Sequence, residues 1–81
     1  MDNNIIVFYE NKKLIIQTDN VIINGIVKVI NKTNVEKELF EHEVTNTNFI
    51  SLDANLPCGK YQIQIVTTFE TNTKDLIINQ R

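Results

Sequence analysis

The segment from Leu52 to Ile65 constrains the fold most, because it combines a tight-turn signal with a strictly alternating apolar stretch. Pro57 presets the backbone angle φ for a turn, and Gly59 supplies the positive φ that such a turn often needs. From residue 61 to residue 65, three apolar residues then alternate with two glutamines. This period of two is typical of a strand with one buried and one solvated face. The segment therefore predicts a strand end, a turn and the start of a second strand.

The same rhythm continues along the rest of the chain. Apolar or alternating segments rich in β-branched and aromatic residues are separated by clusters of Asn, Asp, Thr and Gly, which are turn signals. No window has the apolar spacing of a long helix, and the Asn and Thr turns that flank residues 35–44 favour a strand there too. The predicted strands cover residues 5–9, 14–18, 26–30, 35–44, 48–53, 61–67 and 74–79.

Short, evenly spaced strands predict a two-layer sandwich or a small barrel. At 81 residues the chain is one domain, 1–81, and we expect an all-β fold, a seven-stranded antiparallel immunoglobulin-like β-sandwich. Alternation predicts which residues of each strand point inward. Leu56 is expected to be buried beneath the turn. The predicted core consists of Ile5, Val7, Leu14, Ile16, Val27, Val29, Ile50, Leu52, Tyr61, Ile63, Ile65, Leu76 and Ile78.

Composition argues against several kinds of partner. The net charge is -2, and the eight basic residues are spread along the chain instead of forming a stripe. Nucleic acid is therefore not an expected partner, since phosphate binding needs concentrated positive charge. The apolar run at residues 5–8 is too short for a signal peptide or a membrane span. We expect no membrane span and a protein that stays where it is made, unless a signal peptide before Met1 was removed.

The residues that could carry chemistry are isolated from one another. Cys58 is the only cysteine, so no intrachain disulfide or zinc-type cluster is expected. His42 lies between Glu41 and Glu43, but neighbours on a strand point to opposite faces and cannot converge on a metal. Ser51 lacks the turn of a serine hydrolase, and two glycines are too few for a phosphate loop. The sequence predicts no catalytic residue, cofactor or metal, and no enzyme.

The acidic run on residues 35–44 has two interpretations. Alternating glutamates on a strand protect a sheet edge from aggregation, or they form a docking face for a basic partner. If a partner adds a strand to this edge, the residues we expect to contribute are Leu39, Phe40, His42 and Val44. Some aromatic residues are also expected on an outer face, because alternation places Phe8 and Phe49 opposite inward neighbours. Exposed aromatics of this kind favour contact with another molecule.

The turn segment, together with residues 27–31 and 74–78, resembles the centre of small immunoglobulin-like modules abundant in Bacteroidetes. These modules include the C-terminal sorting domains of type IX secreted cargo and a related family of short secreted proteins. The chain departs from the sorting domains, since it lacks their Asn-Pro entry and has Cys58 where Ser or Ala is common, and we expect it to stand alone without cargo before it. It is also similar to immunoglobulin-like accessory proteins that decorate tailed-phage capsids and tails. The resemblance implies a fold and no catalytic residues.

These observations predict a non-catalytic structural or interaction module that docks onto a larger assembly. The most concrete case is an accessory protein of a phage virion, made in the host cytoplasm, with a capsid or tail protein as its partner. The alternative is a secreted or cell-surface module for sorting or adhesion from a Bacteroidetes bacterium. Homo-oligomerisation stays open in both cases. A small domain without disulfides would gain stability from such an assembly.

Overall fold

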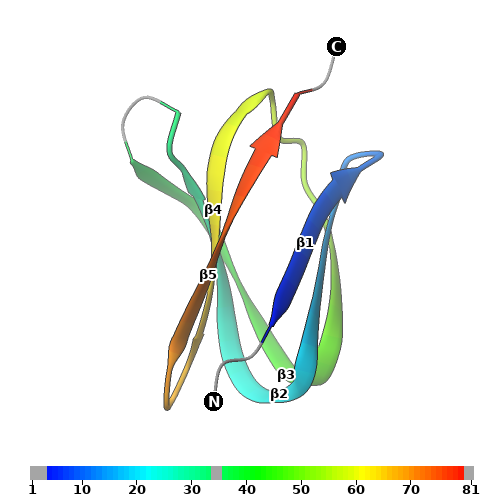
Figure 1. Cartoon of the computed structure of the whole chain (residues 1–81), viewed down its shortest axis with the longest axis vertical. Coiled ribbons are helices and arrows are strands. Elements are labelled where there is room, and N and C mark those ends of the chain that lie inside the picture. Colours follow the sequence, from blue (N-terminus) through cyan, green and yellow to red (C-terminus); the bar gives the residue numbers. More distant parts are fainter. Residues whose placement is uncertain (1–3, 34–35, 80–81) are drawn as a thin grey trace.

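The fold is a single curled antiparallel sheet. The computed structural model describes residues 4–33 and 36–79. These residues contain no helix and five strands: β1 (Ile5–Glu10), β2 (Lys13–Asn31), β3 (Lys37–Asp53), β4 (Gly59–Thr67) and β5 (Thr71–Ile78). Figure 1 shows β2 and β3 turning together at one end, so that the sheet curls and brings β1 near β5. The all-β prediction is confirmed.

The long strand β2 organises the sheet. Along one edge it pairs with β3, from Lys13↔Asp53 to Asn31↔Lys37. Its other edge is shared, because β1 pairs with residues 13–18 and β4 pairs with residues 25–31. β5 continues the sheet beyond β4. The strand order is therefore β1-β2-β4-β5, with β3 beside β2.

The prediction of seven separate strands is not confirmed, because the described residues form five strands. The expected segments 14–18 and 26–30 both lie in β2, and both 48–53 and residues 37–44 of the expected segment 35–44 lie in β3. Glu36 precedes β3, and Val35 is outside the described residues. The segments expected to form turns between these predicted strands, residues 19–25 and 45–47, are inside β2 and β3. Both strands bend in the same place, with a register shift between Gln17 and Ile22, so the β2–β3 pairing resumes after the bend.

The core lies inside the curl, where alternation placed it. Leu14, Ile16, Val27, Val29, Ile63 and Ile65 are its largest fully buried side chains. Of the predicted core, only Val7 and Leu76 are partly exposed, and both pack against the buried cluster. Leu56 is buried as expected. The structure adds two residues to this cluster that the prediction missed, Ile22 and Val44, and it buries Ile30 outside the cluster.

Two tyrosines fix the connection between β3 and β4. The Tyr61 hydroxyl donates to the Pro57 carbonyl at 2.6 Å. The Tyr9 hydroxyl donates to the Ala54 carbonyl at 2.6 Å and accepts from the Leu56 amide at 3.0 Å. These bonds satisfy backbone groups that the irregular segment cannot pair in a ladder. The connection is therefore anchored from β1 and from β4 at once.

Gly59 closes this connection in a conformation that requires glycine. Its φ is 156°, and a Cβ atom there would collide with the Thr33 side chain. The Thr33 hydroxyl accepts from the Lys60 amide at 2.9 Å, and Thr33 also receives support from Asn31, whose side-chain oxygen accepts the Thr33 amide at 2.8 Å. The Asn31-Lys32-Thr33 triplet thus forms a turn that docks on the start of β4.

Candidate functional site

The outer surface of β1 and its neighbours carries a group of exposed apolar side chains. We call this group the apolar face; it consists of Ile6, Phe8, Ile15, Phe49 and Ile77. The exposed fraction is 56% for Ile6, 47% for Phe8, 54% for Phe49 and 61% for Ile77. Ile15, on β2 between β1 and β3, is half-buried. Large apolar residues gathered on one face, as opposed to scattered singly, mark an interaction surface.

Strand register brings these residues together from distant parts of the chain. The two-residue turn at Asn11 and Lys12 has φ values of 53° and 62°, as a type I′ hairpin requires. It sets Phe8 opposite Ile15, and Ile15 is opposite Ser51; we call Phe8–Ile15–Ser51 the Phe8 row. One step along the strands lies the Ile6 row, Ile6–Gln17–Phe49. Together the two rows form a surface three strands wide without a charged residue.

Ile77 extends this surface across the gap between β1 and β5. It lines a shallow hollow together with Phe8. Its neighbours on β5 point inward, since Ile78 is buried and Leu76 packs against the core. The apolar face therefore spans the seam where the curled sheet comes closest to closing on itself.

Charged side chains border the apolar face at one end. Glu10 is opposite Lys13, and Lys13 is opposite Asp53, which gives a charged row on the same side of the sheet. The Lys13 Nζ lies 2.9 Å from Asp53 Oδ1, and both side chains are well exposed. An apolar centre with a charged margin is the usual composition of a protein–protein interface.

The outer surface of the other half of the sheet is polar. We call it the polar face; its central residues are Lys28, Glu41, Gln62, Gln64 and Thr73. Lys28 Nζ lies 3.6 Å from a Glu41 oxygen and 3.8 Å from a Glu38 oxygen. Gln64 donates a side-chain hydrogen bond to Gln62 at 3.1 Å. Four of these five side chains therefore pair with one another.

The predicted docking edge is an edge of the sheet, because β3 pairs with β2 alone among the described strands. Its four nominated side chains do not form one surface. Val44 is buried at 6% exposure, and Phe40 packs partly against the core. Only Leu39, which is 39% exposed, and His42 face solvent. Val44 and Phe40 therefore stabilise the fold and are poor candidates for direct docking.

A bulge places the acidic residues of this edge on one face. Val29 pairs with Phe40 and Ile30 pairs with Glu38, so Leu39 is the extra residue. Glu38 and Glu41 consequently share the Lys28 ammonium group. A hydrogen bond with Glu41, slight burial and the Glu41 charge raise the pKa of Glu38, while Lys28 opposes the shift. Bulges and clustered charge are both devices that protect a sheet edge from adding a strand.

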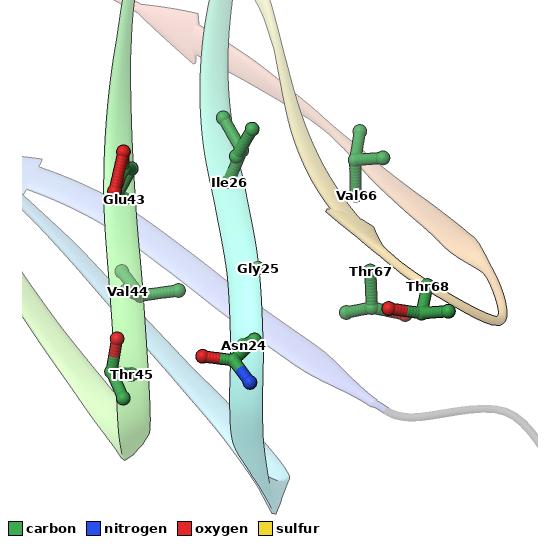
Figure 2. A pocket seen from close by; sticks show the side chains of 9 residues that line it. All are labelled: Asn24, Gly25, Ile26, Glu43, Val44, Thr45, Val66, Thr67 and Thr68. Carbon is green, nitrogen blue, oxygen red and sulfur yellow. The ribbon is translucent and has the colours of Figure 1, made fainter.

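A hollow of about 400 Å³ lies where β2, β3 and β4 meet at the bend. Figure 2 shows its lining, in which Asn24 and Gly25 come from β2, Glu43 and Thr45 from β3 and Thr67 from β4. Gly25 forms part of the lining without a side chain, because a Cβ atom there would lie 3.1 Å from the Val66 carbonyl oxygen. Glu43 is the only titratable residue among those that line it. The hollow thus offers no acid–base pair.

The other residues that could take part in catalysis or metal binding lie apart from one another. Among the described residues, no group of three or more His, Cys, Asp or Glu side chains could hold a metal ion. Ser51 is exposed in the Phe8 row, and Cys58 is exposed in the β3–β4 connection. Within the described part of the chain, no helix is long and apolar enough to cross a membrane.

Comparison with protein-family models found no match, and comparison with curated proteins found none.

Proposed function

We propose that this protein is a non-catalytic interaction module that docks through its apolar face. The observation that carries the proposal is the charge-free surface of the Phe8 and Ile6 rows, which leaves Phe8, Phe49 and Ile6 about half exposed. A chain of 81 residues has little stability to spare. Covering this surface with a partner would remove apolar area from water and stabilise the folded state.

We also propose that the curled sheet is an immunoglobulin-like sandwich with two merged strand pairs. In that sandwich strands A, B and E share one sheet, and strands C, F and G share the other. Here β1 pairs with the first half of β2, which pairs with the second half of β3. The second half of β2 pairs with β4, and β4 pairs with β5. If β2 is divided at its bend into strands B and C, and the second half of β3 is strand E, then β1, β4 and β5 correspond to strands A, F and G in this order.

The hydrogen bond of Tyr61 supports the same interpretation. Immunoglobulin domains have a tyrosine near the start of strand F whose hydroxyl bonds to the backbone a few residues upstream. Tyr61 lies near the start of β4, the counterpart of strand F, and binds the carbonyl of Pro57 four residues earlier. Such a corner fixes how the chain passes from one layer to the other.

The larger assembly that we propose is a phage virion, on which the chain would be an accessory protein bound to a capsid or tail protein. Small size, the apolar face and the resemblance to decoration proteins support this choice. The alternative proposal is a secreted or cell-surface module of a Bacteroidetes bacterium. Both proposals use the same face, because both need an exposed contact surface on a small rigid domain.

Sedimentation of native source material tests the proposal. Wild-type chain should migrate with large particles at a fixed ratio to one major protein. Phe49→Glu, on the apolar face, should leave the particle fraction, whereas Phe69→Glu should remain, because Phe69 is 95% exposed and lies in the β4–β5 turn. Recovery of the wild type only as a small free protein or in the envelope fraction would contradict the virion assignment. Equal binding of both variants would contradict the apolar face.

A further inference from the structure

We propose that the apolar face binds a second copy of this chain, forming a two-fold symmetric dimer in which two sheets pack face to face. This inference names the occupant of the apolar face in the free protein, which the particle would displace on docking, and it rests on the proposed function. A two-fold interface uses the same patch on both subunits, so the patch must complement itself. The arrangement of apolar and charged rows meets this condition in one orientation.

The amount of apolar surface suits a dimer of standard size. Phe8 and Phe49 are about half exposed, which corresponds to roughly 100 Å² each. With Ile6 and Ile77 the face presents apolar surface on the order of 400 Å². A standard interface buries about 800 Å² per partner, of which somewhat more than half is non-polar, or about 450 Å². Two copies of this face would therefore supply the apolar centre that such an interface requires.

Charge selects the orientation of the two copies. If the two-fold axis ran along the strands, the charged rows would meet, with Lys13 against Lys13 and Glu10 against Asp53. Like charges brought together in this way oppose association. If the axis runs across the strands, between the two apolar rows, the charged row of each copy lies over Asn4 and Asp19 of the other copy, which form the next row beyond Ile6. Lys13 of one copy then meets Asp19 of the other, so this orientation brings opposite charges together at each end of the contact.

This orientation predicts which side chains face each other. The Phe8 row of one copy lies over the Ile6 row of the other, because the axis passes between them. Phe8 therefore meets Ile6 of the second copy, Ile15 meets Gln17, and Ser51 meets Phe49. Phenylalanine packed against isoleucine supplies the apolar contact, while the glutamine and serine need only one hydrogen-bond partner or water each.

Sedimentation velocity of the isolated chain over a wide concentration range tests dimerisation. Wild type should shift from monomer to dimer with increasing concentration. Phe49→Glu should raise the dimer dissociation constant by about ten- to a hundredfold, because it replaces an aromatic side chain of the contact with a charge in both copies. Phe69→Glu, the same substitution outside the face, should behave as wild type. Thermal melting of all three proteins at low concentration shows whether each variant is folded.

A mixing experiment tests the orientation. Phe8→Lys and Ile6→Glu should each be monomeric alone, because each places a charge against an apolar residue twice. Mixed in equal amounts, they should form a heterodimer, in which one Lys–Glu pair replaces one contact and the native Phe8–Ile6 contact keeps the other. Absence of a heterodimer would overturn the orientation.

The remaining outcomes are also decisive. A wild-type chain that stays monomeric at every concentration would overturn self-association, and if it still migrates with particles the proposed docking function stands. A wild-type dimer that Phe49→Glu leaves intact would overturn the apolar face as the dimer interface.

Discussion

The two outer faces of this sheet differ in how their side chains are satisfied. On the polar face Lys28 lies between two glutamates, and Gln64 bonds to Gln62. On the apolar face Phe8 and Phe49 are about half exposed with no charged neighbour in their rows. Both faces cover the same buried core, so folding alone does not require this difference. The polar face therefore satisfies its side chains internally, whereas the apolar face leaves large apolar side chains in water.

The largest expected effect is a difference in stability between a variant in the core beneath the apolar face and a variant on the face itself. Ile16 is fully buried beneath the apolar face, and Ile6 is 56% exposed on it. Ile16→Ala should lower the free energy of unfolding by about 2–5 kcal/mol, and Ile6→Ala by less than about 1 kcal/mol. Urea denaturation of both variants at low concentration measures this. Similar losses would mean that Ile6 is part of the core and not available for contact.

A second pair of variants tests the edge strand β3. Phe40→Asp should lower the free energy of unfolding by about 1–3 kcal/mol, because Phe40 packs against the core and a charge there loses water. Leu39→Asp, at the bulge, should cost less than about 1 kcal/mol. Thermal melting distinguishes the two. If Phe40→Asp left stability unchanged while removing partner binding, β3 and not the apolar face would be the docking surface.

The tyrosine hydrogen bonds test whether Tyr9 of β1 and Tyr61 of β4 both hold the β3–β4 connection in place. Tyr9→Phe removes a donor and an acceptor and strands the Leu56 amide, which should cost about 1–3 kcal/mol. Tyr61→Phe removes one bond to Pro57 and should cost about 0.5–1.5 kcal/mol. Hydrogen exchange at residues 54–60 should accelerate in both variants. No acceleration would show that the connection is held by packing alone.

The smallest expected effect is a pH dependence confined to the polar face. The pKa of Glu38 is raised above its ordinary value of 4.5, mainly through the hydrogen bond with Glu41. A raised pKa in the folded state gives stability that is present below pH 4.5 and is lost as pH rises through the folded pKa. Glu38→Gln should remove this dependence in a pH series of urea denaturation curves, while Glu70→Gln should not. Unchanged curves for Glu38→Gln would contradict the pairing with Glu41.

Alternation in the sequence predicted the core because a strand has only two sides. Once residues 61–65 are a strand, Tyr61, Ile63 and Ile65 must share a face, and the turn at Pro57 orients them. The number of strands could not be predicted in this way. Residues 19–24 and 45–48 have turn composition, yet they bend within β2 and β3 because each strand has the other as a neighbour that bends with it. At this bend Asn46 has a left-handed backbone conformation, with a φ of 49°.

The candidate site was predictable only in its parts. Alternation placed Phe8 and Phe49 outside, as the structure shows. It could not place them on one face, since they are far apart in the chain and meet only through the β1–β2 and β2–β3 registers. Composition instead drew attention to residues 35–44, whose glutamates are conspicuous in the sequence. Ile77 carried no signal, because its position depends on the curl that brings β5 beside β1.

The most direct test compares three isoleucines of similar exposure. Ile6 and Ile77 on the apolar face are 56% and 61% exposed, and Ile23, at the bend, is 62% exposed. A soluble paramagnetic agent should relax their methyl signals equally in dilute protein. We expect Ile6 and Ile77 to become protected in concentrated protein or on addition of the particle fraction, while Ile23 stays accessible. Equal accessibility of all three under both conditions would contradict the apolar face as a contact surface.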